Sequence, residues 1–391
     1  MANTLITATA VARESLRILH QKLNFIGSIN RTYDSSFAKD GAKIGDTLKI
    51  RLPNQYSVRT GRILNTQDTV ESNVSLTVAT QKGVDLNFTT AELTLSLDDF
   101  SDRIIQPAMS VLAANIEGDM LSNVYKQVSQ QVNNQGSPAT FAKILSTRKI
   151  LVDSLASPNL NMLLNTQDNV DIVNDNKGLF NDQKEVARQY RDGSMGRAAG
   201  FDFWENTLMP AHTRGAGTGY QVNGANQSGN SLVVSTGTGA VNAGDVFTIA
   251  GVFRVHPETK ISTGLLQQFV VTTNFAGGAG TLQISPAIVS SGPRQNVSVS
   301  PAANAAITFA GPASTTSGIS LGYDKDAFAF ASADLIMPKG VDFSSRQVLD
   351  GISIRIVRAY DINTDTMPCR LDVLYGYQTL RPELAVRVAS N

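Results

Sequence analysis

The fold is decided by one stretch of the sequence, DDFSDRIIQPAMSVLAANIEGDMLSNVYKQVSQQV at residues 98–132. Apolar side chains recur there at every fourth position: Ile104, Ala108, Leu112, Ile116, Met120, Val124, Val128 and Val132. At 3.6 residues per turn, such a row stays close to one face of a helix. Pro107 suits the first helical position, and Asn133, Asn134 and Gly136 end the pattern. We predict a helix of about 37 Å, which serves as a spine for the neighbouring segments.

The N-terminal residues carry a shorter helical pattern. Across residues 4–23, apolar side chains fall on one face of a predicted helix: Leu5, Ala8, Ala12, Leu16, Leu19 and Leu23. A helix of this length and partial apolarity is marginal in water when it stands alone. We therefore expect it to lie on another surface.

The most regular strand pattern in the sequence predicts a long β-hairpin. Apolar residues alternate with polar ones at 48–52 and again at 74–78, and further alternation follows at 84–88 and 93–97. A lone two-stranded hairpin is not stable in water, so its own domain or another subunit must cover its apolar face. We interpret the tip at residues 54–73 as charged rather than apolar, which suits an exposed loop that extends across a neighbouring subunit. Its charged residues are Arg59, Arg62, Asp68 and Glu71.

The chain then changes composition sharply. Residues 141–155 predict a helix and residues 161–164 a buried strand, and residues 166–190 are polar and helical in part. From Gly215 to Ser320, however, there are five charged residues and sixteen of the 31 glycines. Short β-rich runs recur there at roughly ten-residue spacing, which is typical of a small antiparallel barrel or sandwich. Disorder is the alternative, but the β-branched and apolar content favours a folded module.

Past Gly322 the earlier mixture of patterns returns. Residues 327–333 are apolar, residues 352–356 alternate, and residues 371–375 form a closing strand. The glycine-rich block is therefore predicted to be an insertion between two halves of one α/β domain.

The bulk composition excludes several classes of protein. Lys+Arg and Asp+Glu are 33 each, which argues against a protein that holds DNA or anionic membrane through a general basic field. The single cysteine, Cys369, excludes an intrachain disulfide and favours a reducing compartment. The N-terminus lacks the pattern of a secretion signal, and no stretch reaches the ~20 apolar residues of a membrane span. We expect a soluble protein made in the cytoplasm.

The sequence shows no arrangement of residues that predicts catalysis, a cofactor or a metal site. His20, His212 and His256 have no partner at metal-ligand spacing. Gly193-Ser194-Met195-Gly196 lacks the GxSxG spacing of a nucleophile elbow, and the glycines at 215–219 lack that of a dinucleotide-binding loop. Cys369 is expected to be a small strand residue. We therefore expect a protein that is not an enzyme.

Several stretches, taken in order, resemble one family, the major coat proteins of tailed double-stranded DNA bacteriophages. The likeness is greatest to the coat protein of short-tailed Salmonella phages, which carries an inserted β domain. The matching stretches are 112–117 (LAANIE), 165–168 (NTQD), 190–193 (YRDG), 199–202 (AGFD), 244–245 (GD), 249–252 (IAGV), 375–376 (YG) and 381–383 (RPE). Their order and spacing cover most of the chain from about residue 46 onward.

The resemblance implies an α+β fold of the Hong Kong 97 type with a small inserted antiparallel β-barrel. It implies an N-arm at 1–45, an E-loop hairpin at 46–90, and a spine helix with the peripheral domain at 91–135 together with 376–391. The axial domain would occupy 136–215 and 322–375, and the inserted domain 216–321. The apolar row of the helix would pack on a sheet built partly from residues 93–97. Its polar face, with Glu117, Asp119 and Lys126, would face the lattice or the packaged DNA.

The resemblance also implies the function, a major capsid protein that assembles into an icosahedral head around packaged double-stranded DNA. Subunits would form hexamers and pentamers with a scaffolding protein and a portal, with a decoration protein as a further partner, without sequence-specific DNA binding and without a membrane. The candidate inter-subunit contacts are Glu14, Arg17, Arg59, Arg62, Asp68 and Glu71. The stretch at 219–230 is uncharged, unlike the charged loop of the Salmonella-type domain.

Two other functions fit parts of the sequence. One is another phage structural protein, such as a tail-tube or decoration protein, although those are mostly all-β. The other is a glycan-binding protein that uses the glycine-rich block as a β module.

Overall fold

The computed structural model describes residues 13–19, 23–31, 46–59, 61–64, 66–69, 71–88, 105–176, 196–341, 343–349, 352–362 and 366–390. These residues divide into two compact units, each discontinuous in sequence. The first draws on residues 1–51, 73–120 and 328–380, and the second on 52–72, 121–327 and 381–391. Within the described ranges, no helix has the length and apolarity needed to cross a membrane.

An antiparallel sheet forms the base of the first unit. Over the described residues its strand order is β16 (Phe328–Ala333), β19 (Met367–Thr379), β18 (Ile352–Arg358) and β17 (Phe343–Leu349), and β3 (Thr80–Phe88) also pairs with β19. The alternating pattern correctly predicted two of these strands. Its apolar residues are all buried, on β18 at Ile352, Ile354 and Ile356, and on β19 at Leu371, Val373 and Tyr375.

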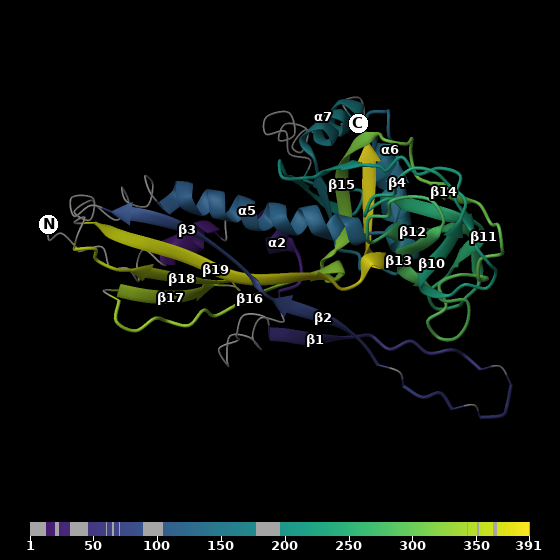
Figure 1. The fold of residues 1–391 in the computed structure, drawn as a ribbon, viewed down its shortest axis with the longest axis horizontal. Coiled ribbons are helices and arrows are strands. Elements are labelled where there is room, and N and C mark those ends of the chain that lie inside the picture. The colour runs from purple at the N-terminus through teal and green to yellow at the C-terminus, as the bar shows by residue number, and fades with distance from the viewer. Residues whose placement is uncertain are drawn as a thin grey trace. The chain divides into compact units, whose positions relative to one another are not determined.

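The spine helix lies along this sheet. Helix α5 spans Gln106–Val124 and continues as a 3₁₀ turn at Tyr125–Gln127, and Figure 1 shows α5 running beside β3 and β19. The Tyr375 hydroxyl donates to the Asp119 carboxylate at 2.8 Å, and the Lys82 ammonium donates to the Asn115 carbonyl at 2.9 Å. The predicted apolar row is buried at Ala108, Leu112, Ile116, Met120 and Val124. The predicted start at 98–104 and the segment 93–97 lie outside the described residues.

The predicted C-terminal end of this helix is wrong. Val128 is extended, and Gln131–Asn133 form strand β4, which pairs in parallel with β20 (Ala385–Ser390). Val128 and Val132 are nevertheless buried. The four-residue spacing predicted their burial correctly. The Val128 N–H donates to the Tyr125 carbonyl at the end of the 3₁₀ turn, whereas Val132 pairs with Val388 of β20, a setting that β-branched side chains fit.

The predicted outward orientation of the polar face is wrong for Glu117. Its side chain is 2% exposed, and its carboxylate accepts a hydrogen bond from the backbone N–H of Phe25. Phe25 lies in the short helix α2 (Asn24–Ser28). Because the first N–H groups of a helix have no partner within it, an acidic side chain there is stabilising. Asp119 is likewise engaged by Tyr375.

The predicted hairpin is present, and its base is covered by its own unit. Strands β1 (Asp46–Leu52) and β2 (Ser72–Val78) pair with each other. Ile50, Leu76 and Val78 are buried in one apolar cluster with small residues of β16, Ala329, Ala331 and Ala333. A Cβ at Gly376 would overlap the carbonyl oxygen of Thr77, so glycine allows β2 to cross close above β19.

The second unit contains a mixed sheet. In the described residues the order is β4, β20, β15 (Thr316–Asp324), β5 (Leu160–Leu164), β7 (Phe201–Glu205) and β6 (Arg197–Ala198), and β8 (Ala211–Thr213) pairs with the start of β15. Helices α6 (Phe141–Asp153) and α7 (Thr166–Asn176) contribute Ile144, Leu151 and Ile172 to an apolar core with Met162 and Phe201. The rest of the segment predicted at 166–190 lies outside the described residues.

The glycine-rich block folds as a β-barrel. Within the described chain its strands follow the order β14 (Ile307–Phe309), β11 (Val246–Val255), β12 (Ser262–Val271), β13 (Gly280–Ile288), β10 (Gly229–Ser235) and β9 (Gln221–Val222). The sheet closes on itself because the Val222 N–H donates to the Ala305 carbonyl and the Ile307 N–H donates to the Tyr220 carbonyl. The interior includes Tyr220, Phe247 and Phe269. The predicted inserted barrel is therefore present.

The compact units group the remaining segments differently from the predicted halves. Residues 328–380 belong with residues 73–120, whereas residues 121–327 belong with 381–391. The decisive pairing is β3 with β19, which runs from Thr80 opposite Tyr375 to Phe88 opposite Met367. Partners this distant in sequence leave no local pattern, so strand periodicity alone could not assign them.

Candidate functional site

The hairpin tip is the first candidate surface. In addition to its charged residues it exposes large apolar side chains, namely Val58 at 95%, Ile63 at 86% and Leu64 at 76% exposure. The interpretation of the tip as charged rather than apolar is therefore incomplete. These apolar residues can be read from the sequence, but the prediction considered only the charged residues of the tip. Exposed apolar groups gathered on one projection are typical of a surface that meets a partner.

Hydrogen bonds within the tip hold its shape. The Gln67 amide oxygen accepts from both the backbone N–H and the hydroxyl of Ser57, each at 2.9 Å, and the Gln67 amide N–H donates to the Ser57 carbonyl at 2.5 Å. Arg59 donates to the carbonyls of Gly61 and Ile63. Arg59 therefore clamps the turn of its own hairpin. Arg62, Asp68 and Glu71 are exposed.

The two candidate residues of the N-terminal helix pair with each other. Residues 13–19 are helical, and the Arg17 guanidinium lies 2.5 Å from the Glu14 carboxylate, three residues earlier. An exposed pair at this spacing adds little to stability. Leu16 and Leu19 on the opposite face are buried, and so is Ile18, as expected for a helix that lies on another surface. Residues 4–12 and 20–22 of the predicted helix lie outside the described chain.

A second candidate lies where the chain enters and leaves the barrel. We call this region the stem, formed by β8 and Arg214 on the way in and by residues 310–318 on the way out. Thr213 pairs with Thr316 across the stem. The stem also holds a chain of buried polar groups. The His212 Nε2–H donates to Asp245 at 2.9 Å, and His212 Nδ1 lies 3.2 Å from the Tyr125 hydroxyl.

Asp245 and Arg387 connect the barrel to the sheet at the stem. Both oxygens of Asp245 are used, since the second accepts from the N–H groups of Gly215 and Asn242. The fully buried Arg387 of β20 donates to the carbonyl of Gly244, and its guanidinium carbon lies 6.0 Å from the Tyr125 ring centre. Burial lowers the pKa of Arg387 to about 10, against the opposing effects of Tyr125 and Asp245.

Further polar bonds join the barrel to the elements around it. The backbone N–H of Gln131 donates to the Gln268 side chain at 2.8 Å, and the Gln268 amide donates back to the Gln131 carbonyl at 3.0 Å. Arg254 donates to the Ser154 hydroxyl at 2.7 Å, at the end of α6. The barrel is thus fixed by directional bonds as well as by its two chain connections. Sequence reasoning missed these residues because the bonds that join them connect residues far apart in the sequence.

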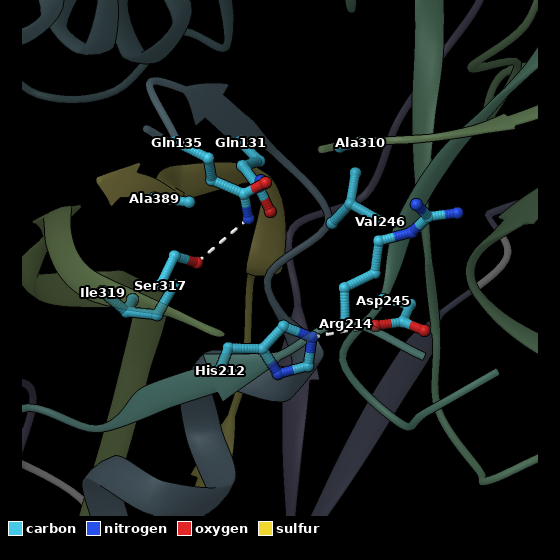
Figure 2. Close-up of a pocket in the computed structure, with 10 residues that line it drawn as sticks. All are labelled: Gln131, Gln135, His212, Arg214, Asp245, Val246, Ala310, Ser317, Ile319 and Ala389. Carbon is cyan, nitrogen blue, oxygen red and sulfur yellow. Dashed lines mark hydrogen bonds and ion pairs between the residues drawn. The ribbon is translucent and has the colours of Figure 1, made fainter. Parts of the chain in front are cut away.

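A small cavity lies within the stem. Its volume is about 10 Å³, and Figure 2 shows Gln135 and Ser317 on one side, Arg214 and Val246 on the other, and His212 beneath. The Gln135 amide N–H donates to the Ser317 hydroxyl at 3.0 Å. A cavity of this size admits no organic ligand.

The described residues offer little for catalysis or metal binding. Over those ranges, no group of three or more His, Cys, Asp or Glu side chains is placed to hold a metal ion. Burial raises the pKa of the Cys369 thiol to about 12, so it is a poor nucleophile. The Gly193–Gly196 turn falls almost wholly outside the described chain.

Comparison with known proteins identifies the family. Residues 28–388 match the family model described as P22 coat protein, gene protein 5. Comparison with curated protein sequences gives no significant match. Among solved structures, the chain is similar to one from Mycobacterium phage Che8, with 11% identity, 92% of this chain and 88% of that chain covered, and a TM-score of 0.46. It is also similar to the capsid structure of Cyanophage P-SCSP1u, with 9% identity, 90% of this chain and 85% of that chain covered, and a TM-score of 0.44. The CUS-3 coat protein I-domain is 30% identical to the part it matches, with 23% of this chain and 92% of that chain covered, and a TM-score of 0.19.

The matched family defines a class of protein, the coat proteins of bacteriophages. The chain belongs to the P22 coat protein family. It is a major capsid protein, and its copies assemble into the icosahedral shell of the phage head, so its place is the virion. The predicted α+β capsid fold of the Hong Kong 97 type with an inserted β domain is confirmed. Neither alternative, a tail or decoration protein or a glycan-binding protein, is supported.

Proposed function

We propose that the hairpin tip is the E-loop, and that it forms the contact between one subunit and its neighbour in the shell. The observation that carries the proposal is the exposure of Val58, Ile63 and Leu64 on a projection that is braced internally by Ser57 and Gln67. A preorganised loop loses little conformational entropy on docking, and burial of apolar side chains supplies the driving force. Arg62, Asp68 and Glu71 would form the polar rim of this contact, and Arg59 would shape it.

The remaining parts have corresponding roles in the proposal. The N-terminal helix with Glu14 and Arg17 would be the N-arm, the unit with α5 and β19 the peripheral domain, and the sheet of the second unit the axial domain. Subunits would form hexamers and pentamers, joined by many modest contacts that act together in a closed lattice. A scaffolding protein and a portal would assist assembly, and a decoration protein could bind the finished shell.

The proposal extends to the contents and origin of the particle. The shell would enclose double-stranded DNA without reading its sequence, in keeping with a chain of zero net charge. Synthesis would take place in the host cytoplasm, which suits a chain whose sole cysteine is buried and unpaired with another. The protein would have no catalytic role.

The test compares shell assembly by three versions of the full chain. Deletion of the tip between Asn54 and Asn73 should leave a folded subunit that fails to form shells, as seen by circular dichroism and electron microscopy. Paired substitution Ile63→Ser and Leu64→Ser should reduce shell yield at least tenfold with unchanged monomer stability. Ile261→Ser, at a similarly exposed position on the barrel, is the matched control. Normal and equally stable shells from both tip variants would refute the contact.

A further inference from the structure

Two buried polar atoms, on side chains that line the stem cavity, have no hydrogen-bond partner among the residues that the structure describes. They are the Nε–H of Arg214, a donor, and the amide oxygen of Gln135, an acceptor. Arg214 is 8% exposed, and its other guanidinium nitrogens donate to the carbonyls of Gly311 at 2.8 Å and Gly217 at 2.6 Å. Leaving a buried donor and a buried acceptor unsatisfied is strongly unfavourable, so each requires a partner.

Gly311 contacts both of these side chains. Its carbonyl receives the bond from Arg214, and its Cα lies against the Gln135 oxygen, since a Cβ at this position would overlap that atom. The same close approach fixes the amide orientation, because the Gly311 backbone accommodates an oxygen at this distance but not an N–H group. Both side chains also line the same cavity of about 10 Å³, so a single small molecule bound there lies beside both.

We propose that one water molecule, bound in the stem cavity, accepts from Arg214 Nε–H and donates to the Gln135 oxygen. The cavity of about 10 Å³ is the size that holds a single water. Water both donates and accepts, as the two atoms require. An anion would satisfy Arg214 but face the Gln135 oxygen, and a cation would face the Arg214 guanidinium. This water would connect Gln135 through hydrogen bonds to Arg214, which follows β8 and donates to Gly311 on the segment that leaves the barrel.

A density map of the assembled shell at a resolution that shows ordered water is the direct test. The proposal expects one peak within about 3.2 Å of both Arg214 Nε and Gln135 Oε1, in shells prepared with and without chloride. A cavity without a peak, beside well-defined Arg214 and Gln135 side chains, would overturn it. A peak that appears only with chloride would assign an anion and also overturn it.

Chemical denaturation of the full chain gives a second test, whose sign depends on hydration. Ala310→Val adds two carbon atoms to the cavity wall. Filling a dry cavity stabilises a protein, whereas displacing a bound water strands its partners. We therefore expect a lower denaturation midpoint for Ala310→Val, and no change for Ala306→Val, an exposed position in the same segment. A higher midpoint for Ala310→Val would refute the bound water.

A pair of variants separates the water from the direct hydrogen bond. Ser317→Ala removes only the partner of the Gln135 N–H, whereas Gln135→Met removes that bond and the oxygen that faces the cavity. With the water present, Gln135→Met should lower the midpoint further than Ser317→Ala. Equal shifts, or a smaller shift for Gln135→Met, would show that the oxygen had no partner to lose.

Discussion

The carboxylate of Glu117, on the spine helix, accepts a hydrogen bond of 3.2 Å from the backbone N–H of Phe25. This bond fixes α2 against α5, and the Phe25 ring meets Phe328 edge to face at a centroid distance of 5.7 Å. A second hydrogen bond attaches the same segment to β16, since the Phe330 N–H donates to the Asn30 carbonyl at 3.1 Å. The N-terminal segment is thus held to the helix and to the sheet edge.

Replacing Glu117 tests this attachment. Glu117→Leu should lower the free energy of unfolding by about 1.5–3 kcal/mol, the range for a buried hydrogen bond to a charged group. It should also speed proteolysis within residues 13–31. Glu117→Gln retains an acceptor and should lose less. Val111→Ala, at an exposed position on the same helix, should change stability by less than about 0.5 kcal/mol. If Glu117→Leu and Val111→Ala behave alike, the bond to Phe25 contributes nothing.

Two glycines should respond in opposite directions to alanine. At Gly376 a Cβ would overlap the Thr77 carbonyl, so Gly376→Ala should destabilise the protein by about 1–3 kcal/mol. At Gly118, inside α5, a Cβ meets no atom within 4 Å. Gly118→Ala should therefore stabilise by about 0.5–1 kcal/mol through helix propensity. Denaturation midpoints of the two variants decide the matter, and a tolerated Gly376→Ala would contradict the close crossing of β2 over β19.

Asp372 should give stability an acid-side pH dependence. Its buried carboxylate accepts from Arg355 at 2.7 Å and from Arg370 at 2.8 Å. Burial raises its pKa, but the bonds from Arg355, Arg370 and Gln81 outweigh burial and hold the pKa below 3.8. Because the pKa is depressed in the folded state, the stabilisation is present above the unfolded pKa of about 3.9 and is lost as the pH falls through the folded value.

Asp372→Asn removes this dependence. We expect a loss of about 3 kcal/mol at pH 7, because the mostly buried Arg355 guanidinium loses its charge partner, and the exposed Arg370 adds little. The difference from the natural chain should shrink as the pH falls below about 4. Urea denaturation at several pH values measures both. A difference that stays constant from pH 7 to pH 2.5 would show that the ionised carboxylate is not the source.

Arg387 should matter far more than a similar residue six positions earlier. Arg387 is fully buried and donates to the Gly244 carbonyl, so Arg387→Ala leaves a large cavity beside Tyr125 and should cost about 3 kcal/mol. Arg381 forms a more exposed pair with Glu383, and Arg381→Ala should cost less than about 1 kcal/mol. Equal effects of the two substitutions on the unfolding transition would refute the role of Arg387 at the stem.

The sequence by itself determined the elements that rest on local patterns. Four-residue apolar spacing located the buried face of α5, alternation located β1, β2 and β18, and glycine-rich composition located the inserted barrel. Such patterns are readable because burial of one face imposes its own period on the side chains. The hairpin tip was located in the same way, with its charged residues but without the apolar ones.

Only the tertiary structure decided which distant segments meet. Val132 is in a strand rather than in the helix because it pairs with β20, and Glu117 is buried where its carboxylate accepts a hydrogen bond from the Phe25 N–H. The stem joins His212, Asp245 and Arg387 from three separate parts of the chain. A hydrogen bond is short and directional, so its partners are fixed by where the folded backbone passes and not by spacing in the sequence.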